Sequence, residues 1–437
     1  MENHVQSVDD ALIGGLSYKL KSGASYVTNR RSVSYFASGG NQYSSSGVRV
    51  IKFNITGDQW LDPSTFRVAL QLNNRDWSAD GTTYVKPLSW NPAVFFRRAR
   101  IICGGVVLED IDDFNRLSLM LTTIKSNEEQ LMIASEGFGS FDDRYAAASS
   151  DTRKEYRSKD YDYSGGVFQS RRVVFKPMFG LLHQEKLLPL RYCPIQVELE
   201  VVNSGADAVH VGSYNGETHT ANWDMTDVQI KCDLLTIDNS LENEYASHLL
   251  SGKTLPINFS TWNHTNQSTG LDKNFSAHIN RSLTRLKAVF ITLGTPDTPK
   301  FKSCSNFYHP MASSVSDSYF VADEHSFQVQ VGSKLYPEYP VTSVTEALYQ
   351  LKKTVGSPFQ MYSRWYRTHR YIIGLDLEKI PGAGFTGMST KSGDLLSLNF
   401  RDCADATNAN VPTRVYCCLY YDCIEHQRFR CRGCGLM

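Results

Sequence analysis

Four residues near the C-terminus, Cys423, His426, Cys431 and Cys434, are of the types that bind zinc. Structural zinc sites are usually built from two such pairs, each with a short and regular spacing. Cys431 and Cys434 have that spacing, but the other pair is irregular. We therefore expect free thiols at this end of the chain, with no bound metal and no other cofactor.

A second candidate site is the segment SRWYRTHRY at 363–371, in which arginines and aromatic residues are interleaved. Arg364, Trp365, Tyr366 and Arg367 have the composition of a surface that stacks bases and binds phosphate. They are also residue types that anchor protein–protein interfaces. The chain is neutral, with 45 basic and 45 acidic residues, whereas dedicated nucleic-acid binders are usually basic. The sequence therefore favours an inter-subunit contact at these four residues, and no sequence-specific nucleic-acid partner is expected.

The sequence lacks the common motifs for catalysis. A metal-dependent enzyme built on a β-barrel needs neutral imidazoles that converge, typically from a His-x-His pair, but the 11 histidines are dispersed and form no such pair. No Gly-x-Ser-x-Gly elbow or phosphate-binding Walker loop occurs either. The acidic run at 108–114 lacks the spacing of a calcium loop, and helix N-capping explains it more simply. We therefore predict that the protein is not an enzyme.

Trp60 raises a different question, because it lies where a solvent-exposed turn is expected. The segment 57–65, GDQWLDPST, separates two segments of alternating residues and contains Pro63, which disfavours a continuous strand. Asp62 can accept a hydrogen bond from the backbone two residues on, which would fix the direction of Trp60 and Leu61. A tryptophan side chain buries on the order of 200 Å², so something must cover it. Either the domain's own residues or a neighbouring chain can do so, and Trp60 and Leu61 are candidates for an inter-subunit contact.

Strands dominate the predicted elements that must position these residues. Alternation of apolar and polar residues, which is typical of half-buried strands, recurs at 195–201, 228–234, 327–331, 396–400 and 415–421. The segment 286–293 is apolar on both faces, which predicts a strand that is covered on both sides.

Helical signals are few. Apolar residues at helical spacing predict helices at 112–125 and 344–355, and a short third helix is expected at 240–250. The second of these begins with the capping box of Ser343 and Glu346.

The order of these elements occurs twice along the chain. A long strand near residue 48 is followed by a helix about 60 residues later, and the same order begins again near residue 284. The repeat predicts two copies of one all-β unit, each a sandwich or jelly roll. We expect an N-terminal arm at 1–25, a first jelly roll at 26–238, a linker at 239–253, a second jelly roll at 254–425 and a C-terminal tail at 426–437.

The composition is that of a folded protein, with 41% apolar and 21% charged residues. No stretch approaches 18 apolar residues, so no transmembrane segment is expected. The N-terminus has neither the basic leader nor the apolar core of a secretory signal. Without an export signal, the ten cysteines are expected to be reduced thiols.

Seven stretches together resemble a known family. In order they are NQYSSSGVRVIKF, QWLDPSTFRV, LEDIDDFNRLSLML, LLPLRYCPIQVELEVV, FQVQVGSKLYPEYPVTSVTEAL, GFTGMSTKSGDLLSLNF and YYDCI. The chain resembles the double jelly-roll major capsid proteins of double-stranded DNA viruses, especially those of Polinton-like viruses and related elements. The resemblance extends from about residue 40 to residue 425 and depends on the joint order of the stretches. The tail departs from it, with more cysteine and arginine than the family pattern has.

The resemblance implies an all-β fold of two tandem eight-stranded antiparallel jelly rolls, with a few short helices in loops. It implies a structural protein: three chains form a pseudo-hexameric capsomer, and capsomers tile an icosahedral virion shell. The implied partners are further copies of the chain, neighbouring capsomers, and penton and minor capsid proteins. The implied location is the virion capsid, after synthesis and assembly in the host cytoplasm or nucleus. Two alternatives stay open, namely a receptor- or carbohydrate-binding jelly-roll protein of a spike or minor capsid component, and a capsid assembly scaffold of the same fold.

Overall fold

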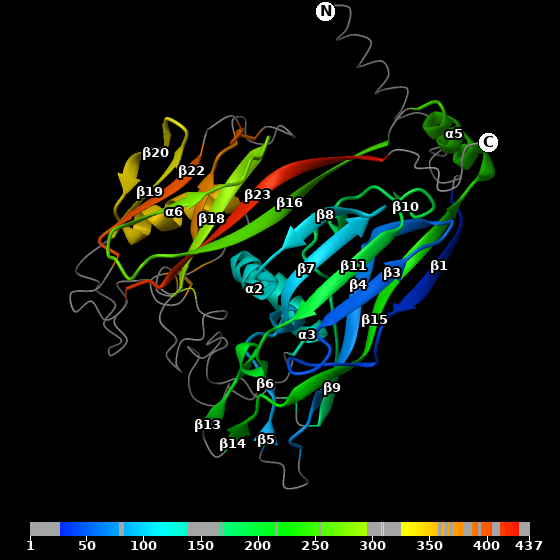
Figure 1. The fold of residues 1–437 in the computed structure, drawn as a ribbon, viewed down its shortest axis with the longest axis horizontal. Coiled ribbons are helices and arrows are strands. Elements are labelled where there is room, and N and C mark those ends of the chain that lie inside the picture. Colours follow the sequence, from blue (N-terminus) through cyan, green and yellow to red (C-terminus); the bar gives the residue numbers. More distant parts are fainter. Residues whose placement is uncertain are drawn as a thin grey trace, which may run out of the picture.

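Two β-sandwiches stand side by side in the computed structural model of the chain (Figure 1). The first is built from residues between 27 and 237, and the second from residues between 255 and 427. The structure describes residues 27–77, 83–138, 167, 169–214, 217–252, 255–294, 307, 309, 325–356, 361, 366, 370–378, 387–391, 395–403 and 411–427.

The first sandwich contains two antiparallel sheets. One has the order β1 (Val27–Phe36), β15 (Trp223–Ile237), β4 (Trp60–Asn74) and β9 (Ser170–Phe175). The other has the order β3 (Val50–Ile55), β11 (Ile195–Val201), β7 (Phe96–Cys103) and β8 (Val106–Ile111). Seven short strands extend these sheets or form small ones beside them: β2 (Gln42–Tyr43), β5 (Thr83–Tyr84), β6 (Lys86–Pro87), β10 (Leu188–Pro189), β12 (Val209–His210), β13 (Gly212–Tyr214) and β14 (Glu217–His219).

The second sandwich repeats this arrangement. Its first sheet has the order β16 (Leu255–Ser268), β23 (Arg414–Gln427), β18 (Leu286–Gly294) and β21 (Ile373–Asp376). Its second sheet has the order β17 (Phe275–Ile279), β22 (Leu396–Arg401), β19 (Ser326–Val331) and β20 (Lys334–Val341).

Strand order identifies both sandwiches as jelly rolls. If the eight main strands of each sandwich are counted along the chain, one sheet contains the first, eighth, third and sixth, and the other contains the second, seventh, fourth and fifth. This order is the same in both sandwiches, and it is the order that a jelly roll requires. The all-β class and the predicted duplication of one unit are therefore confirmed.

Four α-helices accompany the strands in the described part of the chain: α2 (Phe114–Ile124), α3 (Asn127–Glu136), α5 (Asn239–Leu250) and α6 (Val344–Val355). The three helices predicted from the sequence correspond to α2, α5 and α6. Helix α3 was not predicted, although its capping box of Ser126 and Glu129 is visible in the sequence. At α6 the Ser343 hydroxyl accepts a hydrogen bond from the Glu346 amide at 3.0 Å, as the predicted cap requires.

The turn predicted at 57–65 is shorter than expected. Strand β4 begins at Trp60, so Pro63 lies inside a strand. The pairing of β4 with β15 shifts register between Lys231 and Asp233, opposite this segment, and a bulge of this kind accommodates a proline that has no N–H to donate. The predicted local hydrogen bond is present, because Asp62 Oδ1 accepts from the Ser64 amide at 3.0 Å.

Two of the cysteines also differ from expectation. Cys103 and Cys193 form a disulfide with their Cα atoms 5.8 Å apart, so the prediction of reduced thiols is wrong for this pair. Cys103 is the last residue of β7 and pairs with Ile195, the first residue of β11. Cys193 lies two residues before Ile195, so the pairing of the two strands brings the sulfurs together. Free cysteines among the described residues are Cys232, Cys403, Cys417, Cys418 and Cys423.

Candidate functional site at the junction of the two rolls

The two rolls meet at an extensive contact, which we call the inter-roll junction. It is formed by β8 and α2 of the first roll and by β16, β18 and β23 of the second. Buried apolar residues of both rolls form one continuous cluster through it. The rolls are therefore held together by a shared hydrophobic core as well as by the peptide chain between them.

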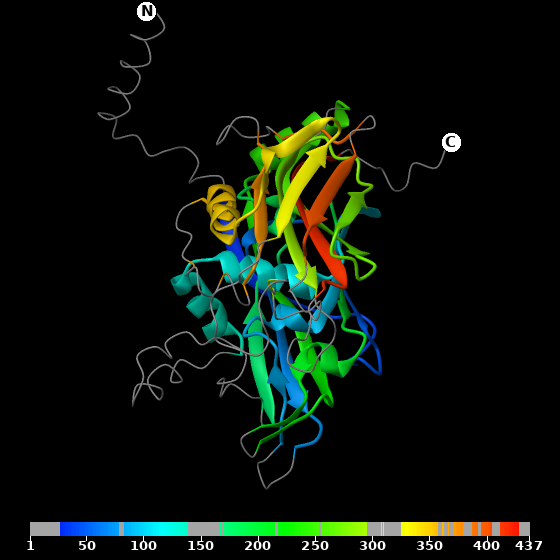
Figure 2. The same ribbon diagram turned by 90° about the vertical axis from the view of Figure 1, so that its left-hand side faces the viewer.

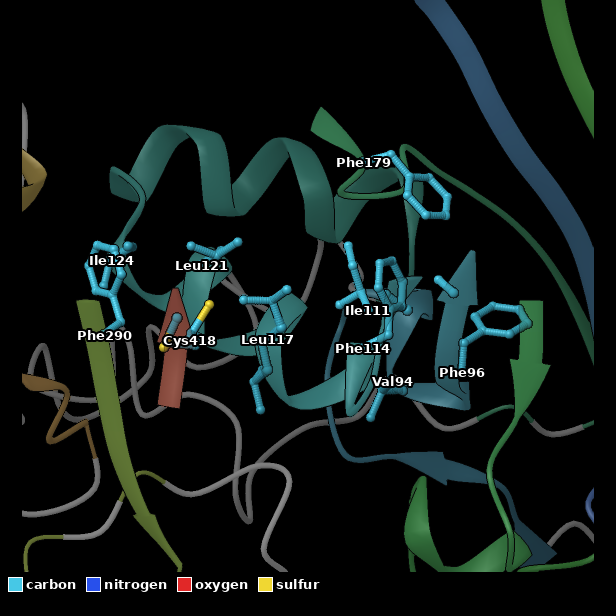
Figure 3. Packing of buried hydrophobic residues seen from close by; sticks show 14 of the residues in the cluster. Val94, Phe96, Ile111, Phe114, Leu117, Leu121, Ile124, Phe179, Phe290 and Cys418 are labelled. Atoms are coloured by element: carbon cyan, nitrogen blue, oxygen red, sulfur yellow. The ribbon is translucent and has the colours of Figure 1, made fainter. Parts of the chain in front are cut away.

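Helix α2 supplies much of that core. Phe114, Leu117, Leu121 and Ile124 recur at helical spacing, and nine of the helix's 11 residues are buried. Figure 3 shows Leu117, Leu121 and Ile124 on the side of Phe290 and Cys418, which belong to the second roll. Such burial on all sides is typical of a helix enclosed between two layers.

Strand β18 is the counterpart of that packing in the second roll. Eight of its nine residues are buried, Lys287 being the exception. The prediction of a strand covered on both sides is confirmed. One face of β18 packs into its own roll, and on the other face Thr292 accepts hydrogen bonds from Arg116 of α2 while Phe290 lies beside Ile124 of α2 (Figure 3).

Arg116 is the polar anchor of α2. Its side chain is buried, and its guanidinium donates hydrogen bonds to Thr292 Oγ1 at 3.1 and 3.2 Å and to the Leu293 carbonyl at 3.2 Å. The guanidinium carbon also lies 4.0 Å from the ring centre of Tyr416 and 5.1 Å from that of Phe307. A desolvated arginine over aromatic rings is stabilised by their negative faces. Arg116 therefore connects α2 to two neighbouring strands of the second roll.

Glu109 of β8 connects three segments at once. Its carboxylate accepts hydrogen bonds from the amides of Gly180 and Leu181, each at 2.8 Å, and from the Thr261 hydroxyl of β16. Complete burial raises the pKa of the carboxyl above its ordinary value, although these three hydrogen bonds oppose the shift. Gly180 must be a glycine here, because a Cβ atom would lie 2.0 Å from the carbonyl oxygen of Ser260.

Asp113 completes the polar part of the junction and corrects one prediction. The residue stands at the N-terminus of α2 with φ of 47°, but its side chain makes no capping hydrogen bond. Instead the carboxylate accepts a hydrogen bond from Asn266 at 2.7 Å and lies 3.4 Å from Nδ1 of His264, both on β16. Burial alone would raise the pKa of Asp113, but the interactions with His264 and Asn266 outweigh it and the pKa is lowered.

Comparison with solved structures agrees with this architecture. No family model and no curated protein sequence matches the chain. PBCV-1 VP54, as fitted into a reconstruction of the virophage Sputnik, is 9% identical, with 94% of this chain and 97% of that chain covered at a TM-score of 0.61. The Faustovirus major capsid protein is 8% identical, with 95% and 92% covered at a TM-score of 0.59. The chain has the double jelly-roll fold.

Within the double jelly roll, Trp60 is covered by its own chain. Its ring centre lies 5.0 Å from that of Tyr245 on α5, and it packs against Leu235 and Ile237. Only 8% of Trp60 and none of Leu61 remains exposed. The chain itself therefore provides the cover of Trp60, through the helix that connects the two rolls. A contact of Trp60 or Leu61 with another chain stays a prediction.

Tyr366 is the described member of the arginine-rich aromatic segment, and it is a core residue. It is fully buried, its hydroxyl donates to the Ile372 carbonyl at 3.0 Å, and its ring centre lies 5.2 Å from that of Tyr371. The second roll encloses this side chain, and an inter-subunit contact at Tyr366 stays a prediction. Arg364, Trp365 and Arg367 lie outside the described residues, so their contact stays a prediction.

Metal and membrane sites can be judged only within the described ranges. No group of three or more histidine, cysteine and acidic side chains there could hold a metal ion. Cys431 and Cys434 lie beyond residue 427, outside those ranges. Among the helices that the structure describes, none has the length and apolarity needed to cross a bilayer.

The junction residues were not identified as a site from the sequence. Glu109, Asp113 and Arg116 appeared there as part of a helix start and its flanking charges. One signal was available, because Arg116 stands inside the otherwise apolar segment FNRLSLML, where a charged side chain must find buried partners. Nothing in the sequence indicated that these three residues would find partners in the second roll, more than 140 positions away.

Proposed function

We propose that the protein is a major capsid protein whose homotrimers are pseudo-hexameric capsomers of an icosahedral virion. The observation that carries the proposal is the pairing of two jelly rolls of identical strand order through one continuous hydrophobic core at the inter-roll junction. The likeness in fold to PBCV-1 VP54 and to the Faustovirus major capsid protein supports it.

The geometry suits a tiling subunit. A chain with two similar rolls side by side gives six rolls when three chains form a ring, and a ring of six similar units has an approximately hexagonal outline. Hexagonal units tile a surface with few gaps. The shared core and the polar contacts of Glu109, Asp113 and Arg116 keep the angle between the two rolls constant, and a closed ring requires a constant angle.

The finer features of the proposal follow from the same role. The partners are copies of the chain, neighbouring capsomers, and penton and minor capsid proteins. The place of action is the virion capsid, after synthesis and assembly in the host cytoplasm or nucleus. The virus belongs to the Polinton-like lineage or to related double-stranded DNA viruses, and the protein has no catalytic role.

Light scattering and electron microscopy of the purified full-length protein test the proposal. We expect a mass three times that of the 49.2 kDa chain and particles of hexagonal outline. The interface should be large, several thousand Å² in all, as obligate interfaces are. A stable monomer at micromolar concentration would contradict the proposal and would favour a receptor- or carbohydrate-binding protein. A trimer that is absent from purified virions would favour an assembly scaffold.

A further inference from the structure

The two rolls correspond element by element. The second roll therefore has an unpartnered counterpart of the surface that the first roll contributes to the inter-roll junction. In the first roll β8 leads into α2, and in the second roll β20 leads into α6. Tyr339 of β20 corresponds to Glu109 of β8, because each precedes the first residue of its helix by five positions. Tyr349 of α6 corresponds in the same way to Leu119 of α2, since each follows that first residue by five positions.

The corresponding residues differ sharply in exposure. Glu109 and Leu119 are 1% and 8% exposed, whereas Tyr339 and Tyr349 are 51% and 60% exposed. The second roll covers β8 and α2, but no described residue covers these tyrosines in the same way. Lys352 and Lys353 lie on the exposed side of α6 as well. Tyrosine is enriched in protein interfaces, since it combines a large apolar ring with a hydroxyl that can hydrogen bond.

The sheet on which α2 packs also has a counterpart in the first roll, and that counterpart is exposed. Helix α2 of the first roll packs on the sheet of the second roll that contains β16, β23 and β18. The equivalent sheet of the first roll contains β1, β15 and β4. Its central strand β4 leaves Arg67, Gln71 and Asn73 partly exposed on its outer face, and Phe36 at the end of β1 is 68% exposed. Strand β18, by contrast, has both faces covered.

The two uncovered surfaces lie at opposite ends of the chain. Figure 1 shows β19 and β20 at one end and β1 and β15 at the other. Figure 2 shows β19 and β20 (yellow) on the side of the second roll nearest the viewer and α6 (gold) at the left flank of that roll. A contact between such ends joins unlike surfaces, and it closes into a ring when repeated by rotation.

We propose that the surface formed by β20 and α6, with Tyr339 and Tyr349 at its centre, binds the outer face of the sheet β1–β15–β4–β9 of a second copy of this chain. This inference rests on the proposed function and specifies which surfaces join the subunits. The contact repeats between chains the packing that β8 and α2 make within a chain. The tyrosine rings and lysine stems cover the sheet, while the tyrosine hydroxyls hydrogen bond to polar groups such as Gln71 and Asn73.

The first test replaces both tyrosines in the full-length protein, as Tyr339→Glu with Tyr349→Glu. The dissociation constant of the trimer should rise by about a hundredfold or more, because each substitution removes an aromatic ring from the interface and requires a carboxylate to be desolvated there. Sedimentation velocity measures the assembly state, and circular dichroism verifies that the rolls are folded. Leu271→Glu is the matched control, because Leu271 is 63% exposed in the turn between β16 and β17, which belongs to neither surface, and the variant should remain trimeric.

The outcomes separate this inference from the proposed function. If the wild-type protein is a trimer and the double variant is also a trimer, the inference is wrong and the proposed function stands. A wild-type protein that is monomeric overturns both.

A second measurement does not depend on a destabilising variant. A photo-reactive benzoylphenylalanine in place of Tyr349 should form crosslinks between chains, and the crosslinked peptides should come from β1, β4, β9 or β15. Crosslinks to any other surface of the neighbouring chain would overturn the inference.

Discussion

Glu109→Ala should weaken the inter-roll junction more than any other single change of an acidic residue there. The variant leaves the amides of Gly180 and Leu181 and the hydroxyl of Thr261 without their acceptor. Each unsatisfied buried donor costs about 1–3 kcal/mol, and the Thr261 hydroxyl can rotate while water can enter the vacated space. We therefore expect the free energy of unfolding to fall by about 3–5 kcal/mol, near the lower end of the sum over the three donors.

Urea unfolding of the full-length protein measures this loss. One fixed protein concentration keeps the contribution of subunit association comparable among the variants. Glu109→Gln should lose less, about 1–3 kcal/mol, because its carbonyl oxygen still accepts from one or two of the donors. The matched control is Glu200→Ala on β11, which breaks a partly exposed ion pair with Arg49 and should cost less than about 1 kcal/mol.

A double-mutant cycle with Thr261→Val assigns the effect to the junction. Thr261→Val should lower stability in the wild-type protein and have little further effect in the Glu109→Ala background, because the two residues share one hydrogen bond. If Glu109→Ala destabilises the protein no more than Glu200→Ala does, the polar contacts do not hold the rolls together, and the apolar core alone does so.

Three further predictions follow from the structure. The pKa of Glu109 is raised in the folded protein, so the stability that its protonated form provides is fully present below its ordinary pKa of 4.5 and is lost as the pH rises through the folded value. The stability of the wild-type protein relative to Glu109→Gln should therefore fall with rising pH. A stability difference that does not change across this pH range would contradict the assignment. Trp60→Ala should lower the free energy of unfolding by about 3–5 kcal/mol. Because α5 of the same chain covers the indole, thermal unfolding over a hundredfold range of protein concentration should show the same loss throughout, whereas a loss that shrinks on dilution would place Trp60 at a subunit contact. Cys103→Ser should lower stability by about 4–5 kcal/mol, because the disulfide closes a loop with a sequence separation of 90, and a reductant should destabilise the wild-type protein similarly while leaving the variant unchanged.

Local pattern sufficed for the elements of this protein. Alternating residues predicted the strands, and apolar spacing with a capping serine predicted α6 within its observed bounds. The unbroken apolar run of β18 even indicated that both of its faces would be covered. These features could be read from the sequence because each depends on neighbours within a few residues. The hydrogen bond from Ser64 to Asp62 is local in the same sense.

Tertiary structure alone decided what covers each element. The sequence required that Trp60 be buried, but only the fold placed Tyr245 of the connecting helix beside it. Glu109 and Arg116 appeared as ordinary charges, because their partners Thr261 and Thr292 are distant in the sequence and come close only when the second roll packs on α2. Burial of a charged group has no local signature, since it depends on desolvation by segments that meet only in three dimensions.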